Sequence, residues 1–298
     1  MKIVVTGSLG HISRPLTTEL LQKKHSVTVI SSNAERIKDI EALGAKAAIG
    51  SMKDVDFLTA TFKGADIVYV MEANGPNWLF DPGDVLVSIT SIGYNYKQAI
   101  QQAGVKKVVH LSSIGAHTNK GNGILAVHYE VENLLSQLPA DVSIKFMRPV
   151  GFYYNLLAFI PTIKTQSTIV SNYGGNDKEP WVEPLDIAHV IAEEMEKPFE
   201  GREIRYIASD EVSPNEAAKI LGEAIGKPDL KWQVIPDEQL LNGMLASGMN
   251  PQVARGFVEM NAARRGGVLY EDYNRNRPAL ESTRMKDFAK EFSVVYNQ

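Results

Sequence analysis

Short apolar runs alternate with longer amphipathic segments through the first half of this chain. Runs rich in β-branched residues are typical of strands buried on both faces of a parallel sheet, and the segments between them repeat at helical spacing. The pattern predicts six strands, at residues 2–6, 27–30, 45–49, 66–71, 107–111 and 142–146. It predicts helices at residues 34–43, 84–103 and 125–138. We therefore expect an α/β fold, a Rossmann-type doubly wound parallel sheet with helices on both faces.

The second half of the chain has a different pattern. Residues 213–216 read Ser-Pro-Asn-Glu, a capping box with proline at the first helical position, which predicts a helix to about Ile225. Asn250-Pro251 opens another helix. A final helix is indicated by an apolar stripe at Met285, Phe288, Ala289 and Phe292. No regular strands are expected between these helices.

These two patterns suggest two unequal domains. We expect residues 1–150, with returning segments at about 180–210, to form a dinucleotide-binding domain. Residues 151–298 would form a smaller, mostly helical substrate-binding lobe that is partly interleaved with it. Ligands of doubly wound sheets bind beyond the carboxyl ends of the strands, so we expect the lobe to cover that edge.

A glycine-containing turn follows the first strand. Its spacing is Gly7-x-x-Gly10-x-x-Ser13, and a helix begins directly after it. Gly7 allows a tight turn, Gly10 lets the backbone approach a pyrophosphate, and Ser13 stands where the usual pattern has a third glycine. The free N–H groups of the first helical turn favour an anion. The turn therefore predicts cofactor-binding residues at Thr6, Gly7, Leu9, Gly10, His11 and Ile12.

Composition narrows the classes of function. The net charge of −4 argues against nucleic acid as a partner, and the absence of cysteine excludes disulfides and thiol chemistry. No apolar run approaches the ~20 residues of a membrane helix. The first strand begins at Lys2 without a signal-peptide pattern ahead of it, so we expect a cytoplasmic protein that uses no membrane. A basic excess at Arg264, Arg265, Arg275 and Arg277 is interpreted as a solvated or salt-bridged surface, and the alternative is recognition of an acidic ligand or partner.

Five segments together resemble a known family. They are residues 6–10 (Thr-Gly-Ser-Leu-Gly), 103–113, 128–132 (His-Tyr-Glu-Val-Glu), 148–155 with Arg148-Pro149, Phe152 and Asn155, and 182–188. In this order they resemble the NmrA-like family of the atypical short-chain dehydrogenase/reductase superfamily, over most of the chain. The resemblance implies a Rossmann-type fold that binds NAD(P). Members include NADPH-dependent quinone and dye reductases, and regulators that bind a dinucleotide and a protein partner.

The segment after the second strand normally sets the choice of cofactor. An NAD site has a carboxylate there, whereas an NADP site has a cation near the 2′-phosphate. Residues 31–36 read Ser-Ser-Asn-Ala-Glu-Arg, with no carboxylate at the strand end. Ser31, Ser32 and Asn33 can donate hydrogen bonds to a phosphate, and Arg36 adds charge, so NADP(H) is favoured over NAD(H). The alternative is that Ser31 to Asn33 only cap the following helix.

The catalytic Tyr-x-x-x-Lys of typical short-chain dehydrogenases is absent, because Asn133 follows Tyr129 at that spacing. Aligning Glu132 with the glutamate of the resembled family puts His128 near the lysine position. His128 is therefore our candidate catalytic residue, which hydrogen-bonds the nicotinamide ribose or supplies a proton near neutral pH. The alternative is a helix histidine that only packs locally.

Several residues that follow predicted strands are expected to border the nicotinamide. These additional cofactor-binding residues are Met71, Glu72, Ser112, Pro149 and Phe152. The loop over residues 71–78, rich in Asn, Gly and Pro, would lie above the cofactor, with Trp78 as a lid residue. The substrate-binding candidates are Trp78, Phe152, Tyr153 and Tyr154, an apolar wall that excludes water and stacks a flat substrate. A simple aromatic core cluster is the alternative for residues 152–154.

Two functions remain open at this point. The first is an NAD(P)H-dependent oxidoreductase that transfers hydride to a quinone-like or other small conjugated acceptor. The second is a non-catalytic NAD(P)-binding redox sensor that acts through a protein partner. The aromatic run after Arg148 and a full second lobe favour a substrate cleft and thus the reductase. The sequence leaves open a homodimer or a protein partner, and it contains no metal-ligand spacing.

Overall fold

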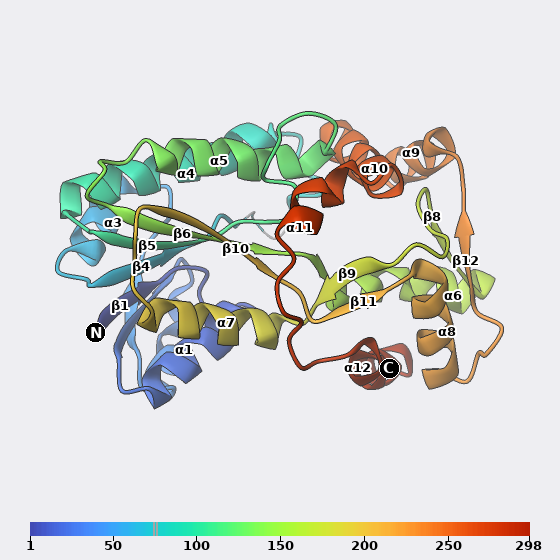
Figure 1. Cartoon of the computed structure of the whole chain (residues 1–298), viewed down its shortest axis with the longest axis horizontal. Helices are drawn as coiled ribbons and strands as arrows, with labels where there is room; N and C mark the ends of the chain where they lie inside the picture. The colour runs from blue at the N-terminus through green and yellow to red at the C-terminus, as the bar shows by residue number, and fades with distance from the viewer. Residues whose placement is uncertain (74, 76) are drawn as a thin grey trace.

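The computed structural model describes residues 1–73, 75 and 77–298, and its centre is a seven-stranded parallel sheet (Figure 1). The strand order is β10-β6-β5-β4-β1-β2-β3. The strands are β1 (Lys2–Val5), β2 (Ser26–Ser31), β3 (Lys46–Ile49), β4 (Ile67–Val70), β5 (Lys107–Leu111), β6 (Ser143–Pro149) and β10 (Arg202–Ile207). Strand β1 pairs with both β2 and β4. The chain direction across the sheet therefore reverses at β1, which is where doubly wound folds bind their ligands.

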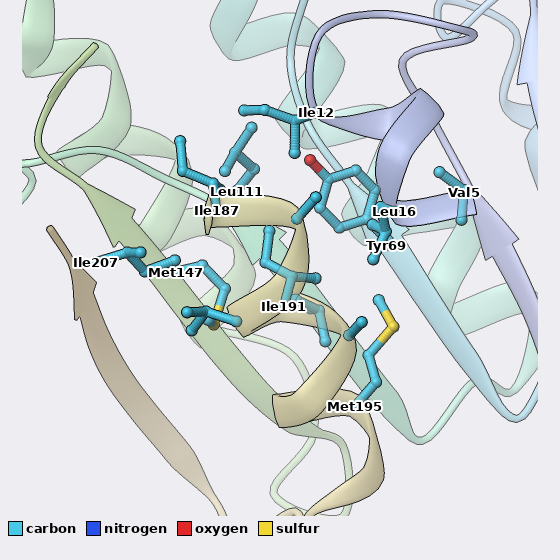
Figure 2. Packing of buried hydrophobic residues seen from close by; sticks show 14 of the residues in the cluster. Val5, Ile12, Leu16, Tyr69, Leu111, Met147, Ile187, Ile191, Met195 and Ile207 are labelled. Carbon is cyan, nitrogen blue, oxygen red and sulfur yellow. The ribbon is translucent and has the colours of Figure 1, made fainter. Parts of the chain in front are cut away.

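Helices cover both faces of this sheet, as the sequence pattern predicts. One face carries α1 (Ser13–Gln22), α2 (Ile37–Ala42) and α7 (Pro184–Glu196), and the other carries α3 (Val55–Phe62), α4 (Val85–Ala103) and α5 (Ala126–Ser136). Successive strand residues point to opposite faces, so Val4 and Val5 belong to different core clusters. Figure 2 shows Leu16 of α1 and Ile191 of α7 packed around Tyr69 of β4.

The Rossmann-type fold is confirmed, and the element bounds differ in detail. The sixth strand runs to Pro149, three residues beyond the predicted end at 146. The predicted helix at 34–43 is a 3₁₀ helix at Ala34–Arg36 followed by α2. Helix α4 ends at Gly104, which adopts a left-handed φ of 73°. Helices α3 and α7 and strand β10 are additional elements around this sheet that the sequence pattern did not assign.

The second half of the chain contains strands that we did not expect. A three-stranded sheet has the order β11 (Asp210–Val212), β9 (Glu179–Val182), β7 (Gly151–Phe152). A two-stranded sheet pairs β12 (Lys231–Val234) with β8 (Thr168–Ser171). The helices are α6 (Ile160–Gln166), α8 (Pro214–Ala224), α9 (Asp237–Ala246), α10 (Pro251–Arg265), α11 (Glu271–Arg275) and α12 (Met285–Tyr296). The region is thus mostly helical with two small sheets, and the expectation of no intervening strands was wrong.

Two helix signals of this region are confirmed. Ser213 Oγ accepts a hydrogen bond from the Glu216 N–H at 3.2 Å, and the Glu216 carboxylate accepts one from the Ser213 N–H at 2.9 Å. Helix α12 buries the predicted stripe, in which Met285 and Phe292 are fully buried. This stripe packs in a third core cluster with Trp181 of β9. Across the described residues, no helix combines the length and the apolar character needed to cross a membrane.

Candidate functional site

The glycine-containing turn joins β1 to α1 as predicted. Gly7 has φ of 86°, which favours glycine, and the Gly10 N–H donates to the Gly7 carbonyl at 3.2 Å. Ser13 is buried, and its Oγ donates to the Thr6 carbonyl at 2.9 Å. A Cβ on Gly7 would lie 2.6 Å from Ser13 Oγ. Ser13 therefore packs in the small space that the usual third glycine provides.

Hydrogen bonds attach this turn to the neighbouring strands. Thr6 Oγ1 accepts from the Met71 N–H at 3.0 Å, just after β4. Ser8 Oγ donates to Ser31 Oγ at 2.9 Å, at the end of β2. The turn thus lies between the carboxyl ends of β4 and β2, at the reversal of strand order. Thr6, Gly7, Leu9, Gly10, His11 and Ile12 all belong to it or to its junction with α1.

The segment after β2 is arranged partly as a helix cap. Ser31 is buried, whereas Ser32, Asn33 and Arg36 are exposed. Asn33 Oδ1 accepts from the Glu35 N–H at 2.9 Å, so Asn33 caps the short 3₁₀ helix. Arg36 Nη1 lies 3.2 Å from Asp39 Oδ2 in an exposed ion pair. An exposed pair of this kind is weak, so the Arg36 guanidinium is available to a phosphate.

A cavity of about 290 Å³ opens beyond the carboxyl ends of β4, β5 and β6. Its wall includes five of the predicted site residues, namely Met71, Glu72, Ser112, His128 and Phe152. The structure therefore brings together side chains that follow three different strands and one that lies on α5. Other wall residues come from α10 and the 3₁₀ helix at Val268–Tyr270, namely Met260, Arg264, Leu269 and Tyr270. The sequence analysis did not assign these four to the site, although Arg264 had been noted as part of a basic excess.

The remaining predicted residues lie outside the wall of this cavity. Pro149 is buried, and its carbonyl accepts from the Ile114 N–H at 2.9 Å. Tyr153 is fully buried and stacks on Phe288 of α12, with ring centroids 5.4 Å apart. The ring of Trp78 lies 6.0 Å from that of Phe257 on α10. Within the loop over 71–78, Asn74 and Pro76 lie outside the described residues.

Tyr154 takes a different direction from its neighbour Tyr153. Its ring stacks on His11 of the glycine-containing turn, with centroids 4.9 Å apart and planes 23° apart. Phe152 lies 5.2 Å from Tyr154, between that stack and the cavity. The aromatic run therefore divides: Tyr153 belongs to the core of the second region, Phe152 lines the cavity, and Tyr154 packs partly against that core and stacks on His11.

His128 is uncharged at neutral pH. Burial lowers the pKa of its imidazole from 6.5 to about 4, and the nearby carboxylate of Glu72 opposes this effect only in part. Its Nδ1 is buried and has no hydrogen-bond partner within the described part of the chain. A neutral ring with a free nitrogen suits a hydrogen bond to a bound ligand better than proton donation as an imidazolium.

Two residues of the family resemblance form a buried ion pair. Arg148 donates from Nε and Nη2 to the two oxygens of Glu132, at 2.9 Å and 2.6 Å. Arg148 Nη1 also binds Asp272 of α11 at 3.0 Å. Ser112 Oγ donates to Glu132 Oε1 at 2.5 Å, so Glu132 also positions Ser112, which is a residue of the cavity wall. These contacts give Glu132 and Arg148 a structural role that joins β6, α5 and α11.

The basic excess in the second region is largely paired. Arg265 binds Asp237 at 2.9 Å and Arg277 binds Glu211 at 3.2 Å, as expected for a salt-bridged surface. Arg264 is instead largely buried. It pairs with Glu179, and its guanidinium lies 3.9 Å from the ring centre of Tyr173. It therefore lines the cavity and does not form part of the salt-bridged surface.

The chain is similar in sequence to proteins that are already known. The model of the NmrA-like family matches residues 1–289. An NAD(P)H azoreductase of Xenophilus azovorans is 24% identical over 261 residues, which cover 87% of this chain and 86% of that protein.

Solved structures share the fold over nearly the whole chain. An NADPH-dependent quinone oxidoreductase of Escherichia coli, complexed with NADPH, superposes with a TM-score of 0.78 at 18% identity. The match covers 97% of this chain and 99% of that one. A triphenylmethane reductase of Citrobacter sp., complexed with NADP(H), superposes with a TM-score of 0.75 at 18% identity and covers 98% of this chain and all of that one.

Proposed function

This chain belongs to the NmrA-like family, and from that premise we propose that it is an NAD(P)H-dependent oxidoreductase that transfers hydride to a quinone-like or other small conjugated acceptor. The observation that carries the proposal is the cavity of about 290 Å³ at the carboxyl ends of β4, β5 and β6, beside the glycine-containing turn. The names of the azoreductase, the quinone oxidoreductase and the dye reductase support the same class of acceptor.

The residues around the turn suit a dinucleotide. The backbone at Gly7 and Gly10 carries no side chain, and a Cβ on Gly7 would meet Ser13 Oγ at 2.6 Å. The start of α1 can therefore receive a diphosphate on its N–H groups. His128 Nδ1, a buried atom without a partner among the described residues, supplies a hydrogen-bonding position for the nicotinamide ribose. Bound NAD(P)H would supply the hydride.

The chain's own contribution to the reaction is orientation and exclusion of water. Leu111, Ile114 and Leu269 give the cavity an apolar character, and Phe152 offers a flat face for a conjugated ring. Residues from α10 and the 3₁₀ helix at Val268–Tyr270 would select the acceptor, which gives the region 151–298 the substrate-binding role in this proposal. Trp78 and Tyr153 lie outside the cavity wall and have no part in it.

We further propose that NADP(H) is the preferred cofactor. No carboxylate occupies residues 31–33, and Ser32 and Asn33 are exposed at the end of β2. The Arg36 guanidinium lies nearby in a weak, exposed ion pair. Ser32, Asn33 and Arg36 would therefore bind the 2′-phosphate of NADP(H) more readily than the two ribose hydroxyls of NAD(H).

The test is the loss of NADPH absorbance with purified protein and a panel of simple quinones and azo dyes, with NADH in parallel. We expect protein-dependent oxidation, and faster turnover with NADPH than with NADH at low cofactor concentration. A Phe152→Ala variant should raise KM for the acceptor more than it changes the Kd for NADPH. A protein saturated with NADPH that oxidises none of it with any acceptor would contradict the proposal and direct attention to a protein partner.

A further inference from the structure

A buried carboxylate and a buried histidine meet at the wall of the cavity. His110 Nε2 on β5 lies 3.0 Å from Oε2 of Glu72, which follows β4. Their side chains are 0% and 2% exposed. Glu72 is itself a wall residue of the cavity, while His110 lies behind it against Phe146, with ring centroids 5.9 Å apart. The pair is thus closed to solvent and adjacent to the space proposed for the reaction.

This pair leaves polar atoms without partners. Glu72 Oε1 and His110 Nδ1 are buried and make no hydrogen bond to any described residue, and the same holds for His128 Nδ1 across the cavity wall. Buried polar atoms are nearly always hydrogen-bonded, because an unpaired one keeps its full desolvation cost. Two of these atoms, Glu72 Oε1 and His128 Nδ1, belong to residues of the cavity wall, which indicates that a ligand in the cavity completes their hydrogen bonds.

Among the described residues, Glu72 is the one carboxylate that has a buried oxygen without a hydrogen-bond partner. The Glu194 oxygens bind Lys145 at 3.0 Å and Lys197 at 2.7 Å. Both oxygens of Glu132 bind Arg148, as described above. A carboxylate that serves only to stabilise the fold is expected to bond with both oxygens. The free oxygen of Glu72 therefore points to a task other than stability.

The two tyrosines and His128 around Glu72 each keep one protonation state near neutral pH. Four titratable groups face Glu72, namely Tyr69 on β4, Tyr96 on α4, His110 on β5 and His128 on α5. Burial raises the pKa of both tyrosines, so their hydroxyls stay protonated, and Tyr96 already donates to the Met71 carbonyl at 2.7 Å. Burial lowers the pKa of His128 to about 4, so that ring carries no extra proton.

We propose that the Glu72–His110 pair supplies the proton that a quinone-type acceptor takes up after hydride transfer. This inference rests on the proposed reductase function. A quinone gains one hydride, with its electron pair, from NAD(P)H, and an oxyanion remains. An O–H bond then forms with the proton that the pair shares, which leaves through Glu72 at the cavity wall while His110 holds that carboxyl group from behind. Water that enters the cavity after the product leaves returns a proton to the pair. The sum is NAD(P)H, one proton and a quinone giving NAD(P)⁺ and a hydroquinone.

Two acceptors separate this role from a structural one. Menadione, a neutral quinone, needs a proton after it receives hydride, whereas the crystal violet cation becomes a neutral product with hydride alone. The variants are Glu72→Gln and His110→Gln, which keep a hydrogen-bonding side chain and hold no exchangeable acid. Glu194→Gln makes the same change in a buried ion pair with Lys145, at a site outside the cavity wall. NADPH affinity and thermal midpoint are measured for each.

We expect Glu72→Gln to lower kcat for menadione by about 100-fold, the usual size of general acid catalysis. With dye and NADPH both saturating, its kcat for crystal violet should change by less than about threefold. His110→Gln should show the same selective loss, and Glu194→Gln neither. If Glu72→Gln fails to fold, His110→Gln decides the matter alone.

Several outcomes overturn the role of the pair. Equal loss with both acceptors would show a structural or cofactor-binding role, and unchanged menadione turnover would remove the pair from the reaction. Wild-type protein that reduces the dye and not the quinone also overturns it. If the wild type reduces only menadione, loss of turnover in both pair variants with intact NADPH binding supports the role. A wild type that binds NADPH and reduces neither acceptor refutes the proposed function itself.

Discussion

A carboxylate placed on the glycine-containing turn should abolish tight dinucleotide binding without unfolding the protein. The change is Gly10→Asp. A Cβ at Gly10 meets only the Gly7 carbonyl oxygen within 4 Å, at 3.2 Å, and Gly10 has no positive φ. A side chain at this position therefore requires the Gly7 carbonyl to move by a few tenths of an ångström, a cost that any two side chains of the same shape share. Gly10→Asn is the matched control, because it has the same shape without the charge.

The expected effect follows from Coulomb's law. Two unit charges 4 Å apart repel by about 1 kcal/mol in water and about 4 kcal/mol at an effective dielectric constant of 20. A diphosphate carries two such charges, so the aspartate costs at least about 2 kcal/mol relative to asparagine. This corresponds to a Kd at least about 30-fold higher.

The assay is a fluorescence titration of both variants with NADPH, with thermal midpoints recorded beside it. Both variants should unfold close to the wild-type temperature. The Kd of Gly10→Asp should exceed that of Gly10→Asn by the stated factor, and the gap should narrow in high salt. Equal Kd values for the two variants would refute the assignment of a diphosphate to this turn.

Three further predictions follow from the ion pairs and from His128. Arg148→Met should lower the free energy of unfolding by about 3–5 kcal/mol, because it leaves the buried Glu132 carboxylate without its ion-pair partner. Arg277→Met, at an exposed ion pair, should lower it by at most about 1 kcal/mol, and equal losses of the two variants in urea denaturation would contradict this reasoning. Between pH 6.5 and about 4, His128 binds a proton in the unfolded chain and not in the folded chain, so the stability of the wild type should fall as the pH is lowered through this range. The stability of His128→Gln should fall less over the same range, which thermal midpoints measured against pH would show. Arg36→Ala should raise the Kd for NADPH about fivefold and leave that for NADH unchanged; an equal change in both Kd values would remove Arg36 from cofactor selection.

The helices and strands could be predicted from the sequence where an apolar run or a helix cap marks their ends. Strand β5 has the bounds that its apolar run predicts, and Asp84 and Gly104 mark the ends of α4. The small sheets were missed because their strands are too short for a period to be visible. Strand β7 has two residues, and β9 contains Pro180, which argues against a strand. Both depend on pairing with distant segments, which no local pattern reports.

The residues of the candidate site also fall into those that local sequence signals predict and those that they do not. The turn from Gly7 to Ser13 carries its own geometry, and its residues could be named from the sequence. The aromatic run could not be resolved, since Tyr153 and Tyr154 are neighbours that point into different surroundings. The contribution of Met260 and Tyr270 depends on how α10 and the 3₁₀ helix at Val268–Tyr270 lie beside distant segments of the chain, which is a tertiary arrangement without a sequence signal.

The buried pair of Glu132 and Arg148 has a consequence for how such chains are compared. These two residues lead a reader of the sequence to the family, yet their side chains bind one another, Ser112 and Asp272. Two chains that share them share a scaffold, and they are free to differ in what they reduce. The identity of an acceptor is therefore better sought by comparing Met260, Arg264, Leu269 and Tyr270, which line the cavity and lie outside the five segments that carry the family resemblance.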